Sequence, residues 1–114
     1  IVTNQAGIAH GKFKLNEMFK FYKHMKYKLS EKNIFINDLR FCPHHPYAKI
    51  KKYKKKCKNR KPGNGMLLSL IKDWNININE SFMIGDKITD KNSAKKTNIK
   101  YFNYCELLLN KQYI

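Results

Sequence analysis

The sequence contains no apolar run of about 18 residues, and this absence excludes a transmembrane helix. It also shows no secretory signal, although the chain opens at Ile1 rather than Met, so its true start can lie outside these residues. Cysteine is sparse and odd in number (Cys42, Cys57 and Cys105), which argues against a disulfide framework. We therefore expect a reducing, cytoplasmic setting, with thiols that are free or bound to metal.

Acidic residues are scarce, because 8 Asp plus Glu stand against 24 Lys plus Arg and the formal net charge is +16. Such a charge attracts phosphates, nucleic acids and anionic membranes. Arginine is scarcer still: only Arg40 and Arg60 occur, and every other basic residue is Lys. Nucleic-acid recognition favours Arg for bidentate contacts, so this bias, with abundant Asn and Ile, favours compositional drift over selection for a polyanion.

Hydrophobic periodicity predicts an α/β domain with a mainly parallel sheet, because strands alternate with helices. The strands are expected over 1–3, 39–41, 81–85 and 100–104, and the helices over 15–29, 65–74, 89–97 and 105–110. Residues 4–11 are expected to form a loop. The Leu, Met and aromatic stripe of the 15–29 helix is expected to face the core.

Residues 42–62 break this alternation with two early prolines and then a run of lysines. The segment is too long for an ordinary connection and too polar for a core, so it is either a functional insertion or disordered. It holds Cys42-x-His44 and, after twelve intervening residues, Cys57. Thiolate and imidazole at such spacing suit tetrahedral zinc, and the alternative is a degraded site whose loop is held by prolines.

Two segments carry groups that can bind phosphate. Residues 3–5 follow an apolar strand, and a hydroxyl with backbone N–H groups at a strand's carboxyl end can cradle a phosphate, although such residues are usually turn formers. Arg60 and Lys61 are adjacent cations that can clamp a phosphate, Arg as a fork and Lys as a point charge. The alternative for this pair is a solvated basic run.

A third segment, Gly85-Asp86-Lys87, follows a buried strand directly. A carboxylate there lies at the sheet edge where open α/β sheets bind ligands, and it can hold Mg²⁺ against a phosphate. Asp90 comes one helical turn later, placed to orient the loop. Asp86 can also serve as a helix N-cap, and the two roles are compatible.

The order and spacing of these segments resemble the haloacid dehalogenase superfamily. The likeness extends to the subfamily of D-glycero-D-manno-heptose 1,7-bisphosphate 7-phosphatases and histidinol phosphatases, over essentially the whole chain. It is carried by four stretches: VTNQAGIA (2–9), CPHHP (42–46), RKP (60–62) and MIGDK (83–87). The resemblance implies a Rossmann-like core domain, partial over 1–114, with a zinc-loop insertion at about 42–62 and its first strand missing.

The resemblance also implies a cofactor, a substrate and site residues. It implies Mg²⁺ and a phosphorylated sugar, the 7-phosphate of heptose 1,7-bisphosphate first and histidinol phosphate second, in an enzyme that is monomeric when complete. Thr3 and Lys61 would stabilise the transferring phosphoryl group, and Asp86 would bind Mg²⁺. The implied substrate contacts are Asn4, Gln5, Ala6, Arg60 and Lys87.

The resembled subfamily has a zinc site of pattern Cys-x-His then Cys-x-Cys. Here Cys42, His44 and Cys57 match it, but Asn59 stands at the last cysteine's position. Asn is a poor zinc ligand, so His45 or water would have to complete the shell. If zinc binds, we expect a structural role.

The chain departs from the family in one further respect, because no Asp-x-Asp pair occurs in its sequence. That pair would supply the nucleophile and the general acid/base, and we expect it upstream of Ile1. The 114-residue chain alone is therefore expected to be inactive. Two competing functions are a basic zinc-containing nucleic-acid-binding module, with Tyr47 and Tyr53 stacking on bases, and an inactive remnant that keeps the phosphate pocket.

Overall fold

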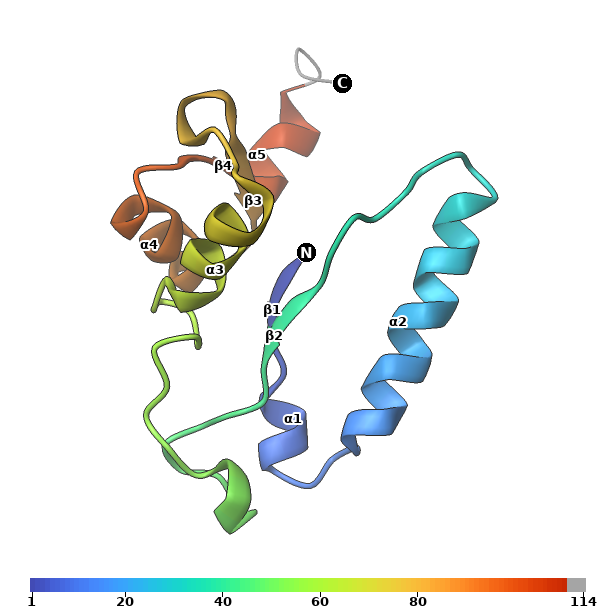
Figure 1. Ribbon diagram of the computed structural model, residues 1–114, viewed down its shortest axis with the longest axis vertical. Coiled ribbons are helices and arrows are strands. Elements are labelled where there is room, and N and C mark those ends of the chain that lie inside the picture. The colour runs from blue at the N-terminus through green and yellow to red at the C-terminus, as the bar shows by residue number, and fades with distance from the viewer. Residues whose placement is uncertain (111–114) are drawn as a thin grey trace. The chain divides into compact units, whose positions relative to one another are not determined.

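A computed structural model describes residues 1–110 as two compact units (Figure 1), the first spanning Ile1–Cys57 and the second beginning at Lys58. The first unit contains β1 (Val2–Asn4), α1 (Ala6–Ala9), α2 (Leu15–Ser30), β2 (Arg40–Cys42) and the 3-10 helix η1 (Lys51–Tyr53). The second contains α3 (Gly65–Trp74), η2 (Ile78–Glu80), β3 (Phe82–Gly85), α4 (Ile88–Lys96), β4 (Lys100–Asn103) and α5 (Tyr104–Leu109). Within residues 1–110, no helix is both long and apolar enough to cross a membrane.

Both units are built on a parallel strand pair, which confirms the expected α/β class. In the first unit β1 pairs with β2, and Asn4 lies opposite Cys42. In the second unit β3 pairs with β4, and Gly85 lies opposite Asn103. Because parallel strands end at the same edge, each pair gathers its C-terminal loops on one side.

The α2 helix has the predicted extent, but its apolar stripe is less buried than expected. Met18 is buried, whereas Phe19 is 46% exposed. Much of the stripe lines a hollow of about 550 Å³ beside β1, with Tyr22 and Met25 on the helix side and Leu39 across from them. A single pair of three-residue strands offers too little surface to cover a 16-residue helix.

The expectation of a plain loop over residues 4–11 is wrong in part, because α1 forms inside it. Ile8 and Ala9 are 2% and 0% exposed, so burial of their apolar side chains stabilises this single turn. The sequence predicts a loop here because Gly7 lies within this turn and Gly11 soon after it, and glycines usually mark loops. The 42–62 segment follows a defined path, with η1 and a bridge between His45 and Lys54.

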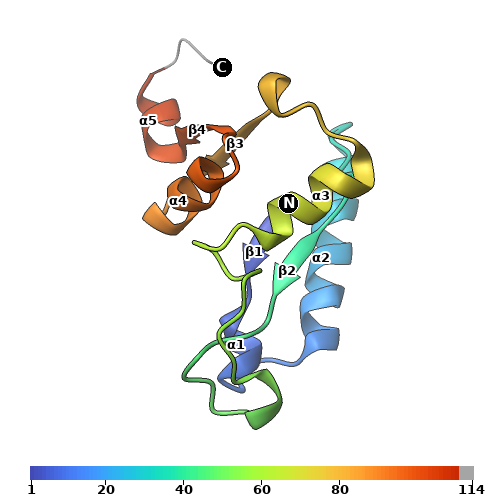
Figure 2. The ribbon, with the colours of Figure 1, turned by 60° about the vertical axis from the view of Figure 1, so that its left-hand side comes forward.

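The second unit packs α4 and α5 against the β3–β4 pair, as Figure 2 also shows. Met83 and Ala94 are buried at the centre of this packing. The fully buried hydroxyl of Ser93 on α4 donates to the Gly63 carbonyl at 2.9 Å, and this bond ties the segment before α3 to α4. The segment that carries Lys61 is thereby fixed relative to β3 and α4.

Candidate active site and metal cluster

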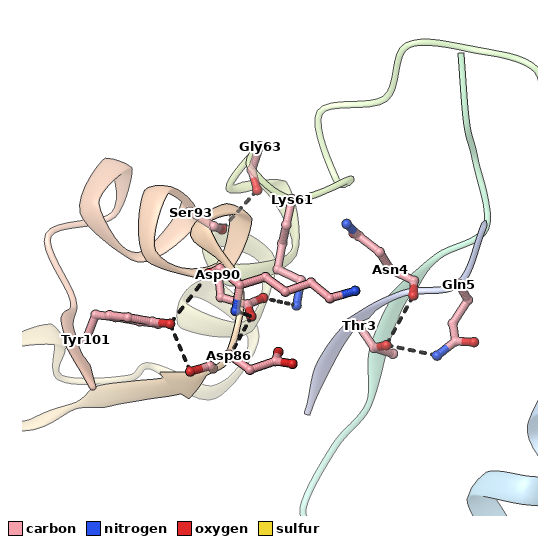
Figure 3. Close-up of polar contacts among 11 residues, drawn as sticks. Thr3, Asn4, Gln5, Lys61, Gly63, Asp86, Asp90, Ser93 and Tyr101 are labelled. Carbon is pink, nitrogen blue, oxygen red and sulfur yellow. Dashed lines mark hydrogen bonds and ion pairs between the residues drawn. The ribbon is translucent and has the colours of Figure 1, made fainter. Parts of the chain in front are cut away.

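The centre of the second unit's site is an ion pair between Lys61 and Asp90 (Figure 3). The Lys61 Nζ donates to Asp90 Oδ1 at 2.6 Å, and the two side chains are only 11% and 8% exposed. The other carboxylate oxygen of Asp90 accepts from the backbone N–H groups of Asp86 at 3.2 Å and Lys87 at 3.1 Å. Asp90 therefore holds the lysine and the Asp86 loop at the same time.

The protonation of Asp90 follows from this setting. Burial by itself would raise the pKa of the Asp90 carboxyl group, because it disfavours the charged form. The hydrogen bond from Lys61, the two backbone N–H donors and the lysine's charge act in the opposite direction. Together they hold the Asp90 pKa below its ordinary value of 3.8, so the group is a carboxylate at neutral pH.

Asp86 lies directly after β3, with its side chain exposed. It does not cap α4: the N-cap position is Lys87, and the loop N–H groups are taken by Asp90. Among residues 1–110 the Asp86 carboxylate has no hydrogen bond or ion pair, so its oxygens are available to a ligand from outside. An oxygen donor at a sheet's carboxyl edge is the kind of ligand that Mg²⁺ takes.

Tyr101 is a site residue that sequence reasoning missed. From β4 its hydroxyl donates to the Gly85 carbonyl at 2.9 Å and reaches the Lys87 carbonyl at 3.5 Å (Figure 3). Burial, followed by the negative charge of Asp90, raises the Tyr101 pKa, so the hydroxyl stays a donor. No local pattern marks such a residue, because its role depends on the register that sets it opposite Met83.

Arg60 and Lys87 supply further positive charge in the second unit. The Nη1 atom of Arg60 is buried and has no hydrogen-bond partner among residues 1–110. An unsatisfied buried donor is uncommon, and an anionic ligand would satisfy it. The side chain of Lys87 is exposed beside Asp86.

In the first unit, residues 3–6 lie at the end of β1 and the start of α1. The Gln5 Nε2 donates to Thr3 Oγ1 at 2.8 Å, and the backbone N–H of Gln5 donates to the Cys42 carbonyl at 2.8 Å (Figure 3 shows the side-chain bond). Thr3 is thus oriented by its neighbour, and the loop that contains Asn4 is tied to the end of β2. Ala6 is the first residue of α1.

The first unit also brings Cys42, His44 and Cys57 together. One ligand atom of each lies within 4.8 Å of the others, and the Cys42 Sγ is 3.7 Å from the His44 Nδ1. Burial and then the positive charge of Lys55 lower the His44 pKa, which favours the neutral imidazole that binds metal. Two thiols and an imidazole in this arrangement fit zinc.

His45 is not one of the ligand candidates of this metal cluster (Cys42, His44 and Cys57). The Nδ1 of His45 accepts the backbone N–H of Tyr47 at 3.0 Å, and its ring packs on His10 with centroids 4.8 Å apart. The amide oxygen of Asn59 lies against Gly65, where a side chain would collide with it. Among His, Cys, Asp and Glu side chains in the described residues, the metal cluster therefore comprises three candidate ligands.

The sequence of residues 30–104 matches the family model of the haloacid dehalogenase-like hydrolases. The match covers more than half of the chain, so the chain belongs to this family, and the resemblance seen in its motifs is confirmed.

Curated relatives narrow the likeness to one kind of phosphatase. The chain is 38% identical to D-glycero-beta-D-manno-heptose-1,7-bisphosphate 7-phosphatase of Rhodopseudomonas palustris, over 91% of this chain and 58% of that protein. It is 40% identical to the protein of the same name from Photorhabdus laumondii, over 82% of this chain and 50% of the relative. The chain thus spans about half the length of the curated relatives it matches.

Solved structures agree on the fold. A protein of Mesorhizobium loti, classed provisionally as a HAD-like phosphatase, superimposes with a TM-score of 0.80 at 27% identity, covering 86% of this chain and 48% of that one. The D,D-heptose 1,7-bisphosphate phosphatase of B. bronchiseptica, complexed with magnesium and phosphate, gives a TM-score of 0.75 at 22% identity, over 88% and 52%. At that identity the second likeness shows the fold alone.

Proposed function

We propose that this chain is part of a Mg²⁺-dependent phosphatase that removes the 7-phosphate of D-glycero-D-manno-heptose 1,7-bisphosphate. The observation that carries the proposal is the buried Lys61–Asp90 pair, which holds the loop of Asp86 at the carboxyl end of β3. The names of the curated relatives support the choice of a heptose bisphosphate. A nucleic-acid-binding module would leave this arrangement without a role.

Each residue of the second unit then has a chemical task. Asp86 would hold Mg²⁺, which when bound neutralises charge on the phosphate. Lys61 would direct an N–H toward the transferring phosphoryl group, with its position fixed by Asp90. Arg60 and Lys87 would contact the substrate, and the unsatisfied Nη1 of Arg60 supports an anionic partner.

In the first unit, Thr3 would donate its hydroxyl to the phosphoryl group, with Asn4, Gln5 and Ala6 lining the substrate site. The metal cluster would have a structural role. Cys42 lies opposite Asn4 in the strand pair, and its carbonyl accepts the Gln5 N–H. Zinc held by Cys42 would therefore stiffen the loop that follows Thr3, as well as order the segment that leads to Arg60.

The nucleophile is the part of this mechanism that the 114 residues do not supply. The sequence has no Asp-x-Asp pair, and Asp86 and Asp90 are already engaged as metal ligand and lysine partner. We propose that turnover requires an Asp-x-Asp pair from outside these residues. The first aspartate would attack phosphorus and break its bond to the C7 oxygen of the sugar, which the second aspartate would protonate. Water would then hydrolyse the aspartyl phosphate, releasing inorganic phosphate and the free nucleophile. The 114-residue chain alone would not turn over substrate.

The test is a phosphate-release assay on two proteins, the 114-residue chain and the chain preceded by an Asp-x-Asp segment. That segment is the coding sequence upstream of Ile1 if it encodes the pair, and otherwise an Asp-x-Asp segment taken from the part of the R. palustris relative that this chain does not match. Both are assayed with Mg²⁺ on heptose 1,7-bisphosphate and on histidinol phosphate. We expect activity only in the longer protein, and a higher kcat/KM for the heptose bisphosphate.

Two variants of the longer protein assign the roles. Asp86→Asn should raise the Mg²⁺ concentration needed for half-maximal rate, and Lys61→Met should lower kcat by about 100-fold or more, as loss of a charge-stabilising donor does. A substantial rate from the chain alone would refute the external nucleophile. Preference for histidinol phosphate would shift the assignment to the second candidate substrate.

A further inference from the structure

We propose that the metal cluster binds zinc as an open, three-ligand site, whose fourth coordination position takes an exchangeable anionic ligand from solution. Structural zinc sites are closed by four protein ligands, whereas three protein ligands leave a position for water or another small ligand. Within residues 1–110 the group of candidate ligands comprises Cys42, His44 and Cys57 and no fourth side chain. Zinc is nearly always four-coordinate in proteins, so we infer that the fourth ligand comes from solution.

The nearest alternative, His45, is committed elsewhere. Its Nδ1 accepts the Tyr47 N–H at 3.0 Å, its backbone N–H donates to the Tyr53 carbonyl at 3.1 Å, and its ring packs against His10. Turning His45 toward the cluster would break the side-chain bond and the ring contact together. These contacts favour a fourth ligand other than His45.

Exposure shows which part of the cluster meets solvent. Cys42 is 1% exposed and forms its buried base, whereas His44 and Cys57 are half-buried. Lys54, Lys55 and Lys56 immediately precede Cys57 with exposed side chains. A bound metal would thus be reachable from a strongly positive rim, which favours small anions such as hydroxide or a thiolate over neutral ligands.

The test replaces zinc by Co²⁺, whose visible bands report coordination number and whose near-ultraviolet charge-transfer absorption grows with the number of thiolate ligands. Azide is the anionic probe and imidazole the neutral one. We expect azide to shift the visible bands of the native chain saturably, and imidazole to do so only at a concentration at least tenfold higher. Cys57→Ser should lose the charge-transfer band in part and weaken Co²⁺ binding at least tenfold.

A second variant adds a ligand instead of removing one. Asn59→Cys places a thiol two residues after Cys57, within about 7 Å along the chain. It should add charge-transfer absorption, tighten Co²⁺ binding at least tenfold and abolish the response to azide. Lys58→Cys is the matched control, since it adds one cysteine at the neighbouring exposed position and should behave like the native chain.

Two results would overturn the proposal: no Co²⁺ binding by the native chain, or a native spectrum that azide leaves unchanged. None of these measurements uses a phosphate substrate. An open metal site and the proposed phosphatase activity can therefore fail or stand separately.

Discussion

The two clusters of polar groups in this chain differ in the chemistry of the side chains that they bring together. In the second unit the Asp90 carboxylate is buried but receives three donors, from Lys61 and from the N–H groups of Asp86 and Lys87. The metal cluster of the first unit instead gathers two thiols and an imidazole, with the Cys42 Sγ 3.7 Å from the His44 Nδ1. Internal hydrogen bonds hold the first arrangement in place, whereas the second is a group of side chains that could hold a metal ion.

This difference has an energetic consequence. A buried charge with its partners in place resists rearrangement. Removing any partner leaves the free energy of desolvating the charge uncompensated. Under the proposal above, a metal bound by the two thiols and the imidazole would link the loops of the first unit, so the stability of that unit would depend on metal supply. We therefore expect the second unit to be sensitive to mutation and pH, and the first to metal.

The largest effect is expected from Asp90→Ala, which leaves Lys61 charged, buried and without this partner. Breaking a buried pair costs about 3 kcal/mol or more of unfolding free energy, measurable by urea denaturation. Asp86→Asn is the matched control: its carboxylate is exposed and has no ion pair among residues 1–110, so stability should change by less than about 0.5 kcal/mol. Equal losses of unfolding free energy in both variants would show that the buried Asp90 carboxylate stabilises the fold no more than the exposed Asp86 carboxylate does.

A smaller effect is expected from acid, because protonation keeps the shape of the Asp90 side chain. The Asp90 pKa is lower in the folded state than its ordinary value of 3.8. Its contribution to stability is therefore fully present above about pH 4, and is lost as pH falls through the lower folded-state pKa. Unfolding free energies from about pH 6 to about pH 2 should decline in this window, and the decline should be shallower in Asp90→Asn.

The range from about pH 6 to about pH 8 is the internal check on this assignment. Asp90 stays ionised throughout that range, so its contribution to the unfolding free energy should not change. A native chain whose acid sensitivity equals that of Asp90→Asn would show that other carboxylates dominate the titration.

Local periodicity was enough to place most elements of this fold. The 65–74 helix was predicted with its observed bounds, since Met66, Leu67 and Leu70 follow the helical period. The parallel strands followed from their alternation with helices. Burial of α2 was not predictable in the same way, because it depends on how much sheet lies opposite, and a stripe of apolar residues carries no information about that surface.

The candidate site shows the same difference between local contacts, which the sequence predicts, and distant contacts, which it does not. Asp90 was expected to orient the loop after β3, and the structure shows this through its bonds to two backbone N–H groups. Its pairing with Lys61, across 29 positions, could not be read from a chain with so many lysines. Contacts within one helical turn follow from spacing, whereas contacts between distant segments follow from packing that spacing does not encode.

The smallest effect is expected from Tyr101→Phe, which removes the hydroxyl that holds the Gly85 carbonyl but keeps the ring. One neutral hydrogen bond contributes about 1 kcal/mol, so unfolding free energy should fall by about that amount. Tyr104→Phe is the matched control, because the Tyr104 side chain is 51% exposed. In a protein completed with its nucleophile, Tyr101→Phe should also raise the Mg²⁺ concentration for half-maximal rate by several-fold, because the Asp86 loop loses a support from β4. If stability falls while that concentration stays constant, Asp90 alone positions the loop, and the preorganisation of this site resides in one carboxylate rather than in a network.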